Sequence, residues 1–578
     1  MTIPRAEHPR PQFERESWVN LNGEWDFAFD FSVSGKERQW YQEPDFPEKI
    51  QVPFCPESRL SGIGFTDFMN AIWYARKFSV TKEQLAGRIL LHFGAVDYLC
   101  EVWINGKSAG THKGGYASFS FDITELVACG ENTVVVYALD MPRENPQPRG
   151  KQSAPLYSQG CSYTRTTGIW QTVWMEFVPM TYLQGVHLTT DSANGTVTAR
   201  LRVAGESRGY QLRLTASFGG AEEAAYTAAV DGEYTTVQFQ IERPKLWNVG
   251  EPNLYTITYE LVRDGQVIDL VKGYFGVRSL TWRGGALCIN GRPVFQRLVL
   301  DQGFYPDGIC TAPSDATLCQ DIALSMELGF NGARMHQKVF EERYLYHADR
   351  MGYLVWGEYG SWGIDVSNAG AISDLLPEWL EVVERDYSHP SIITWCPFNE
   401  TWDYEGRQQD NELLRVTYHA TKAADPTRPV IDTSGNYHVI TDIYDIHDYE
   451  QDVALYQKRY RAVGEGEYFE TYPKRQCYGG QPYLVSEYGG TWWAPGRQDG
   501  WGYGEQPKSE QEVAGRYEGL TTALLECKNV CGFCYTQLTD VEQEQNGLYT
   551  YERERKFSDE IYETIRRTNL QKAAIEEE

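Results

Sequence analysis

The sequence predicts a multidomain protein in which two β-sandwiches are followed by a C-terminal (β/α)8 TIM barrel. The chain has 578 residues, more than one hydrophobic core usually serves. Short apolar runs separated by turn signals fill the first half, a pattern typical of sandwiches. In the second half, amphipathic helices alternate with strands too apolar for one-sided burial, which is typical of a parallel barrel. We therefore expect domains at residues 1–180, 181–278 and 279–578.

The first domain is predicted to be all-β. Its extended stretches include "GRILLHFGAVDYLCEVWING", "NTVVVYALD" and "GIWQTVWMEFV". Within the first of these, "WINGK" at 103–107 places an Asn-Gly pair between extended segments, which indicates a hairpin. The second domain keeps a β pattern, with about seven strands in about 100 residues, the rhythm of an immunoglobulin-like sandwich. It lacks a Cys–Trp–Cys framework, so only the architecture is implied.

Strand–helix alternation begins near residue 279. The segments "ATLCQDIALSMELGF", "FEERYLYHADRMG" and "LLPEWLEVVERDYSHP" have the pattern of helices, and "YLVWGEYG", "SIITWCPFNE" and "PYLVSEYGG" that of buried strands. About eight such repeats in about 290 residues fit a (β/α)8 barrel.

Composition narrows the possible partners. With 53 Lys and Arg against 80 Asp and Glu, the formal net charge is −27, which repels phosphate backbones and anionic membranes. The N-terminus has no apolar segment of a secretory signal, and the 12 cysteines are scattered. We therefore expect reduced thiols in a cytoplasmic protein. No His/Cys cluster has zinc-ligand spacing, so neither a metal nor a cofactor is predicted.

Candidate functional residues lie where the predicted barrel strands end, because catalytic groups of such barrels occupy that edge. The polar strand ends are Arg334, His336, Glu358, Asn399, Glu400, Asp432, Asp445, His447, Tyr449 and Glu487. This edge is rich in acids and aromatics and has no phosphate-binding glycine loop. It indicates carbohydrate chemistry.

Glycoside hydrolysis needs two carboxylates across the scissile bond, and Glu400 and Glu487 are the best pair. Each follows a strongly apolar strand, and Asn399 beside Glu400 is suited to bind a substrate hydroxyl. The alternative is that a strand-end Glu only caps the next helix, but two in register near Trp402 and Trp492 favour catalysis.

The other strand-end residues have alternatives too. His336, His447 and Arg334 are candidates for substrate contact, and the two histidines fit ordinary hydrogen-bonded positions at the edge of the barrel equally well. Glu358 belongs to the same candidate set, although a supporting or packing role suits it and Asp432 better.

Several motifs, in the same order along the chain, resemble those of the family 2 glycoside hydrolases, which include β-galactosidases, β-glucuronidases and β-mannosidases. The motifs are "WVNLNGEWDF" (18–27), "WYARKF" (73–78), "TTGIWQTVW" (166–174), "INGRPVF" (289–295), "GFNGARMH" (329–336), "FNE" (398–400) and "SEYG" (486–489). The resemblance implies a jelly-roll sugar-binding domain, an immunoglobulin-like domain and a catalytic barrel.

The resemblance also implies a retaining double displacement. In it, Glu487 is the nucleophile, Glu400 is the acid/base, Asn399 binds the 2-hydroxyl and Tyr449 orients Glu487. An exo-acting enzyme would have its site walled into a pocket by the loops 450–480 and 490–508. Family members are often dimers or tetramers, so the resemblance also implies self-association.

Two departures from the family pattern bear on the substrate. Family β-glucuronidases grip the sugar carboxylate with an Asn-x-Lys motif, where this chain has Glu544 and Asn546, and an acid there would repel a glucuronate. Lys338, two residues beyond His336, offers another cation for a carboxylate, unless it is solvated or paired with an acid. We expect a β-hexuronide of galacturonide type or a β-galactoside as substrate. The alternatives are a β-glucuronidase, a β-mannosidase, an endo-acting glycanase and a catalytically silent carbohydrate-binding protein.

Overall fold

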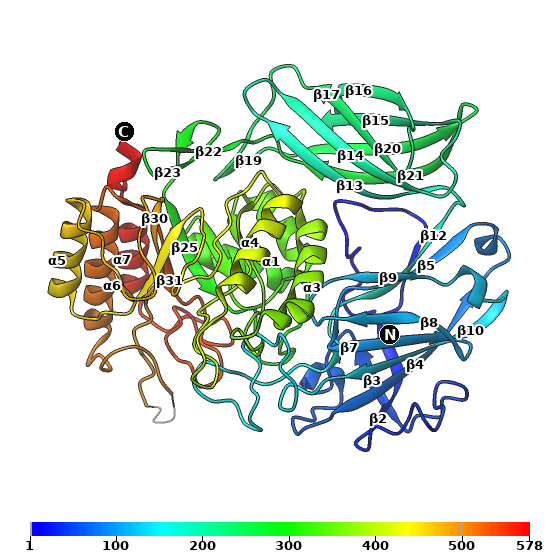
Figure 1. Ribbon diagram of the computed structural model, residues 1–578, viewed down its shortest axis with the longest axis horizontal. Coiled ribbons are helices and arrows are strands. Elements are labelled where there is room, and N and C mark those ends of the chain that lie inside the picture. Colours follow the sequence, from blue (N-terminus) through cyan, green and yellow to red (C-terminus); the bar gives the residue numbers. More distant parts are fainter. Residues whose placement is uncertain (1–2, 497–499, 578) are drawn as a thin grey trace.

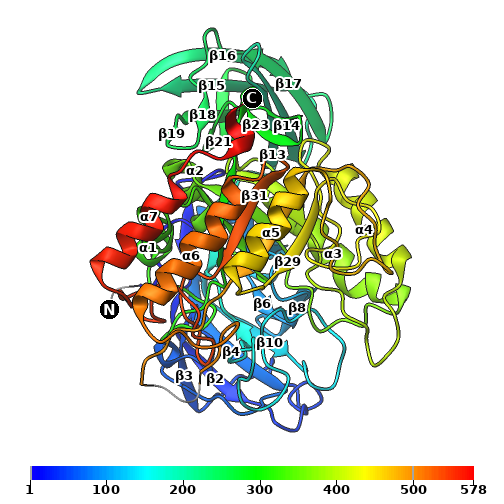
Figure 2. The same cartoon turned by 90° about the vertical axis from the view of Figure 1, so that its left-hand side faces the viewer.

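The computed structural model describes residues 3–496 and 500–577, which form three domains (Figure 1). The barrel and the N-terminal sandwich lie side by side, and the immunoglobulin-like sandwich packs along one side of both (Figures 1 and 2). Among the described residues, no helix is long and apolar enough to cross a membrane.

The N-terminal domain is a sandwich of a four-stranded sheet, order β1-β12-β5-β9, and a six-stranded sheet, order β3-β2-β4-β10-β7-β8. Its strands are β1 (Trp18–Asn20), β2 (Gly23–Phe29), β3 (Glu48–Val52), β4 (Ala71–Val80), β5 (Arg88–Phe93), β7 (Leu99–Ile104), β8 (Lys107–Lys113), β9 (Phe119–Asp122), β10 (Gly130–Leu139) and β12 (Val173–Val178). Buried side chains such as Trp25, Ile72 and Val136 fill the space between the sheets. The predicted hairpin is confirmed, since β7 pairs with β8 across the Asn105–Gly106 turn.

The second domain has seven main strands in two antiparallel sheets, ordered β13-β14-β17 and β16-β15-β20-β21. The strands are β13 (Tyr182–Asp191), β14 (Thr196–Ala204), β15 (Tyr210–Phe218), β16 (Ala221–Ala229), β17 (Tyr234–Gln240), β20 (Tyr255–Arg263) and β21 (Gln266–Phe275). Residues along β17 alternate between exposed and buried, as one-sided burial against a second sheet requires. The predicted immunoglobulin-like architecture is confirmed.

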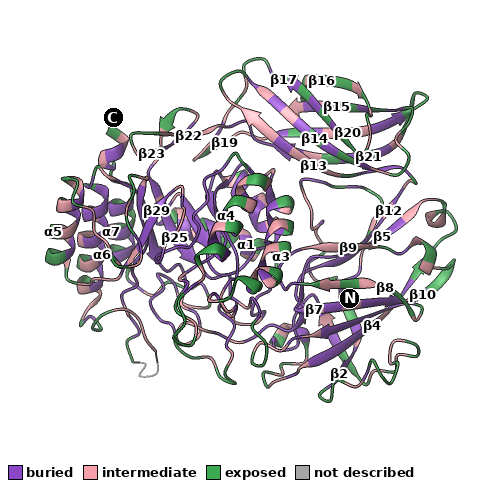
Figure 3. Ribbon diagram, viewed as in Figure 1, coloured by how far each residue is buried: buried purple, intermediate pink, exposed green. Residues whose placement is uncertain are grey.

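The third domain is built on a curled parallel sheet, order β28-β27-β26-β25-β31-β30-β29. Its strands are β25 (Gln296–Asp301), β26 (Gly332–Met335), β27 (Leu354–Glu358), β28 (Ile392–Cys396), β29 (Tyr444–Asp448), β30 (Tyr483–Gly489) and β31 (Val530–Thr536). The surrounding helices are α1 (Asp315–Glu327), α2 (Glu342–Met351), α3 (Ile372–Asp386), α4 (Asn411–Ala424), α5 (Val453–Gly464), α6 (Glu510–Leu525) and α7 (Asp559–Asn569). The strands are buried, whereas the helices expose their outer faces (Figure 3).

Short elements connect these parts. They are the two-stranded ladders β6 (Val96–Asp97) with β11 (Gly168–Ile169) and β18 (Trp247–Asn248) with β19 (Glu251–Pro252), the small sheet β22 (Leu280–Arg283), β23 (Ala286–Ile289) and β24 (Arg292–Pro293), and the 3₁₀ turns Arg59–Ser61, Gln84–Ala86, Thr124–Leu126, Ala369–Ala371 and Ala574–Glu577.

The expectation of eight full repeats is wrong for one of them. The fifth strand position is held by residues 430–434, which make only isolated parallel bridges to the β28 segment, Trp395 with Val430 and Asn399 with Ser434. No helix follows before β29. The buried Asp432 carboxylate accepts the backbone N–H groups of Val439 and Ile440, at 2.6 and 2.9 Å, and so holds this connection in an irregular turn.

The N-terminal domain packs against the C-terminal ends of the barrel strands. Backbone N–H groups of Arg149 and Gly150 donate to the carbonyls of Trp362 and Gly360, at 2.8 and 3.1 Å. A Cβ on Gly150 would lie 2.0 Å from the Gln337 carbonyl oxygen, so only glycine permits this close approach. A loop of the first domain is thereby held beside the barrel loops that follow β26 and β27.

Candidate active site

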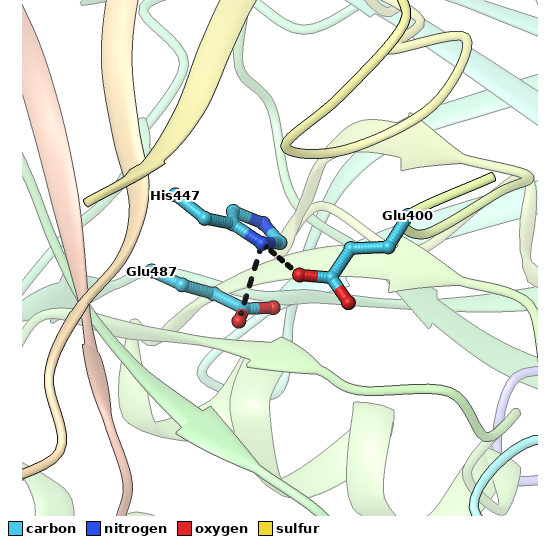
Figure 4. Close-up of side chains that lie close together, drawn as sticks. All are labelled: Glu400, His447 and Glu487. Carbon is cyan, nitrogen blue, oxygen red and sulfur yellow. Dashed lines mark hydrogen bonds and ion pairs between the residues drawn. The ribbon is translucent and has the colours of Figure 1, made fainter. Parts of the chain in front are cut away.

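The predicted catalytic pair converges at the C-terminal edge of the barrel (Figure 4). Glu487 lies on β30, Glu400 follows β28, and His447 of β29 lies between them. One ligand atom of each of these three side chains lies within 4.8 Å of the others, so an oxygen of Glu400 lies no more than 4.8 Å from an oxygen of Glu487. This spacing is near the about 5–5.5 Å of retaining glycosidases and well short of the about 6.5–9.5 Å of inverting ones.

Glu487 is held by Arg334 of β26 and by two residues from the end of β29, His447 and Tyr449. Tyr449 Oη donates to its Oε2 at 2.6 Å, and Arg334 Nη1 donates to its Oε1 at 2.9 Å. His447 Nδ1 lies 3.3 Å from Oε2. The Tyr449 ring is stacked on Tyr503 at 3.4 Å between centroids. These contacts fix the orientation of the carboxylate, and they place Tyr449 where the resemblance implied it would be.

Glu400 is paired with His447 and sits on a constrained backbone, with φ at +43°. His447 Nδ1 lies 2.7 Å from its Oε1, and the Trp402 indole N–H donates to its Oε2 at 3.1 Å. Burial acts to raise the pKa of Glu400, but the hydrogen bond and charge of His447 outweigh it and lower that pKa. Burial acts to lower the pKa of His447, but the charge of Glu487 and the bond to Glu400 raise it. Both shifts favour a proton on His447, next to the carboxylate of the predicted acid/base.

Arg334, a candidate for substrate contact, and Glu358, for which the sequence favours a supporting role, both bond to other groups of the protein. The Arg334 side chain is fully buried, and its guanidinium donates to Glu358 Oε2 at 2.5 Å and to Asn399 Oδ1 at 2.5 Å, besides Glu487. Glu358 accepts the backbone N–H of Gln337 at 2.9 Å with its other oxygen. Because their hydrogen-bonding groups are engaged within the protein, both residues position the site.

Asn399 keeps a donor available. Its Oδ1 accepts from Arg334, whereas its Nδ2 is buried without a hydrogen-bond partner in the part of the chain that the structure describes. A buried amide donor without a partner is costly unless a ligand completes it. This arrangement supports the predicted bond from Asn399 to a substrate hydroxyl.

The remaining candidates differ in environment. His336 is buried, with Nδ1 3.0 Å from Glu358 Oε1, and burial together with the charges of Lys151 and Arg334 lowers its pKa well below the usual value. Trp402 is 44% exposed. Trp492 is half-buried, and within residues 3–496 and 500–577 its indole N–H has no hydrogen-bond partner and no contact links it to the carboxylates.

The contacts of Lys338 do not favour the predicted carboxylate site. Its ammonium donates to the carbonyls of Gly303 and Cys310, the second at 2.7 Å. The chain turns at Gln337, whose φ is +51°, and the next side chain packs beneath the loop between β25 and α1. Lys338 thus stabilises that loop.

Sequence reasoning missed a second lysine, Lys151, which the N-terminal domain supplies. It is buried, and its ammonium lies 4.1 Å from the centre of the Trp362 ring. The Trp362 indole N–H donates at 2.9 Å to the backbone carbonyl of Asn399, the residue before Glu400. No spacing rule connects residue 151 with a barrel site more than 200 residues later, so no sequence pattern indicates this lysine.

Glu544, which stands at a position of the altered Asn-x-Lys motif, is also buried in this region. Tyr163 Oη of the N-terminal domain donates to its Oε2 at 2.6 Å, and Asn546 Nδ2 donates to its Oε1 at 3.1 Å. Burial raises the pKa of Glu544.

Solved structures share this architecture. The β-glucuronidase from Ruminococcus gnavus, in complex with an N1-substituted uronic isofagomine, superposes with a TM-score of 0.80 at 18% identity and covers 98% of this chain and 100% of its own. The Bifidobacterium dentium β-glucuronidase, complexed with coumarin-3-O-glucuronide, has a TM-score of 0.79 at 20% identity and covers 96% of this chain and 98% of its own. At these identities the likeness establishes the fold.

A curated relative from Formosa agariphila, provisionally named as a β-glucuronidase, is 26% identical over an alignment of 501 positions that covers 83% of this chain. The match spans only 57% of that relative's length.

Three family models match the chain in order, each for one domain of the same family. The sugar-binding domain of glycosyl hydrolases family 2 matches residues 18–146, a second family 2 model matches 181–278, and the family 2 TIM barrel domain matches 283–500. Together with the motif order, these matches account for all three domains. The chain belongs to glycoside hydrolase family 2.

Proposed function

We propose that the protein is a retaining exo-β-glycosidase that removes a terminal β-linked hexuronic acid residue. The observation that carries the reaction type is the approach of the Glu400 and Glu487 carboxylates to within 4.8 Å. The names of the similar proteins, all β-glucuronidases, support a uronide.

The geometry supports the following sequence of steps. A carboxylate oxygen of Glu487 forms a bond to the anomeric carbon while the bond to the leaving oxygen breaks, and Glu400 supplies the proton to that oxygen. The resulting glycosyl ester is then attacked by water, whose proton returns to Glu400 as the ester bond breaks. Asn399 Nδ2 donates a hydrogen bond to the 2-hydroxyl of the sugar. Arg334 holds Asn399 and Glu487 in fixed positions relative to each other.

The exo-acting mode is supported by side chains that the two long loops bring to the site. The predicted loop 450–480 contains helix α5, and Tyr472 from the segment after that helix packs edge-on against Trp402 at 5.8 Å between ring centroids. Tyr503, from the loop 490–508, stacks on Tyr449. Residues 497–499 of the second loop lie outside the described residues. The predicted cytoplasmic location and self-association are further parts of this proposal.

Two observations favour different uronic acids. The similar proteins are named for glucuronides, whereas Glu544 and Asn546 replace the motif with which family β-glucuronidases grip their sugar. The replacement favours a galacturonide, the epimer at carbon 4, and hydrolysis rates decide between the two.

The test uses aryl β-galacturonide, β-glucuronide, β-galactoside and β-mannoside, with Glu487→Gln as the control. We expect a uronide to be cleaved fastest and the activity to be lost in the variant. Early NMR spectra should show the β-anomer of the released sugar, and a 2-deoxy-2-fluoro uronide should label Glu487. Release of the α-anomer, or activity surviving in Glu487→Gln, would contradict the mechanism. Faster cleavage of a neutral glycoside would leave the retaining mechanism in place but contradict the assignment of a uronide as substrate.

A further inference from the structure

The position of Lys151 is fixed by the docking of the first domain on the barrel. The backbone on its N-terminal side is bonded to the loop that follows β27, through Arg149 and Gly150. On the other side, the Tyr163 N–H donates to the Lys151 carbonyl at 2.7 Å, and Gln152 Nε2 donates to Asp97 Oδ2 at 2.7 Å. Both neighbours of Lys151 are thus anchored, which directs its side chain over Trp362.

The Lys151 ammonium lies inside the site without a direct partner. The residue is only 6% exposed, and among the described residues its side chain forms no hydrogen bond and no ion pair. Burial acts to lower its pKa, but the charges of Cys161, Glu544, Glu487 and Glu400 outweigh burial and raise it. Lys151 is therefore a charged group close to both catalytic carboxylates.

A buried ammonium of this kind is suited to an anion. The cation–π contact with Trp362 holds the charge but satisfies none of its three N–H donors. The nearby carboxylate of Glu544 is already bonded to Tyr163 and Asn546. A charge-assisted hydrogen bond to an incoming carboxylate is stronger than one to a hydroxyl, and it would offset the repulsion from the three glutamates around the site.

We infer that Lys151 binds the carboxylate of the hexuronic acid substrate, so that selectivity for uronides over neutral sugars is supplied by the N-terminal domain. This inference rests on the proposed function, because it names the group that recognises the acid of that substrate. Lys151 takes the role that the sequence had suggested for Lys338, whose donors face backbone carbonyls instead.

The experiment compares substrates that differ only at carbon 6. The kcat/KM of wild type, Lys151→Met and Lys151→Arg is measured for aryl β-galacturonide against β-galactoside, and for β-glucuronide against β-glucoside. We expect Lys151→Met to lower kcat/KM for the preferred uronide by about a hundredfold, as loss of one partner of a buried charge pair does, and to change the neutral sugar by less than about threefold. Lys151→Arg keeps the charge and should retain most of the uronide preference.

Lys338→Met serves as the matched control, because it removes a second buried lysine of the same region. It should lower the melting temperature and leave the ratio of uronide to neutral activity unchanged. As a readout that does not require turnover, calorimetry with free D-galacturonate, D-glucuronate and D-galactose is run on wild type and Lys151→Gln. Only the affinity for the free uronic acids should fall.

Two failures are distinguishable. If wild type prefers uronides and Lys151→Met keeps that preference, or loses both activities equally, the inference is overturned and the proposed function stands. If wild type cleaves the neutral glycosides faster, the uronide assignment itself fails and the inference falls with it. Should Lys151→Met not fold, the Lys151→Arg and Lys151→Gln ratios decide in the same way.

Discussion

The barrel strand ends and the N-terminal loop that covers them both present charged side chains to the site, but they hold them differently. At the strand ends, Arg334 is fully buried and bonded to Glu358, Glu487 and Asn399. In the N-terminal loop, Lys151 is almost as buried, yet its ammonium only faces the ring of Trp362.

This difference separates two tasks. A guanidinium whose acceptors all lie within the protein keeps catalytic groups at fixed distances, which a reaction common to many substrates requires. An ammonium without a partner is available to a ligand and can select among substrates. Substitutions at strand ends should therefore impair every substrate alike, whereas substitutions in the covering loops should change which substrate is preferred.

The largest effect is expected at the proton donor. Glu400→Gln keeps the shape of the side chain but removes the transferable proton, so kcat/KM should fall by about 10²–10⁴-fold for substrates with poor leaving groups. A dinitrophenyl leaving group needs no proton, and its first-step rate should change far less. Rates measured over a series of leaving groups check this prediction, and an equal loss for all of them would contradict the acid role.

Arg334→Lys tests the positioning role of the strand ends. A lysine cannot bond the three acceptors of the guanidinium fork, and Glu358 would be left buried without its partner. We expect kcat to fall by about a hundredfold for uronides and neutral sugars in equal proportion, and the free energy of unfolding to fall by about 3–5 kcal/mol. The matched substrate pairs and denaturant unfolding provide both measurements. A selective loss of uronide activity would break the distinction between strand ends and loops.

The same difference between strand ends and loops explains which parts of the site could be predicted from the sequence. Glu400 and Glu487 could be found because each ends an apolar strand, and the C-terminal ends of parallel strands meet at one edge of a barrel. The pairing of His447 with Glu400 and of Arg334 with three partners depends on side-chain directions that no local pattern encodes.

The docking of the N-terminal domain on the barrel could not be predicted from the sequence, for a different reason. Lys151 reaches the site because Arg149 and Gly150 bond to the loop after β27 and so attach a loop of the N-terminal domain to the barrel. Contacts between domains produce no periodic pattern in the sequence. Lys338 lies close to His336 along the chain, but the turn at Gln337 directs its side chain elsewhere. The missing helix after the fifth strand likewise follows from one side chain, Asp432, which captures backbone N–H groups.

His438, which contacts two aspartates of the strand ends, should make the free energy of unfolding depend on pH. His438 lies 2.8 Å from Asp432 and 3.2 Å from Asp445. Burial acts to lower its pKa, but the two aspartates outweigh burial and raise the pKa from 6.5 to about 10. Because the folded pKa is the higher one, protonated His438 stabilises the fold fully below about pH 6.5, and this stability is lost as the pH rises toward about 10.

We therefore expect His438→Gln to lower the free energy of unfolding by a few kcal/mol at pH 6, with a difference from wild type that shrinks steadily up to pH 10. Denaturant unfolding of both proteins between pH 6 and 10 is the measurement. A difference that does not depend on pH would show that His438 acts through packing alone.

The smallest effect is expected in the outer loops, at Trp402. Its ring is 44% exposed beside Glu400, and it packs edge-on against Tyr437 and Tyr472 at 5.9 and 5.8 Å between centroids. If Glu400 protonates the leaving oxygen, as proposed, a ring at this place adjoins the leaving group. Trp402→Ala should lower kcat/KM about tenfold for aryl or glycosyl leaving groups and much less for a methyl glycoside, as loss of one stacking contact implies.

Trp402→Phe separates this contact from the indole hydrogen bond to Glu400, since it keeps a ring and removes the N–H. If both variants lose activity equally and for every leaving group, Trp402 acts on the acid/base and belongs with the strand ends. If only the alanine variant is impaired, and only toward large leaving groups, the loops select both ends of the substrate. Lys151 would then recognise the carboxylate and Trp402 the leaving group. The residues at the barrel strand ends would then serve the chemical steps and not the choice of substrate.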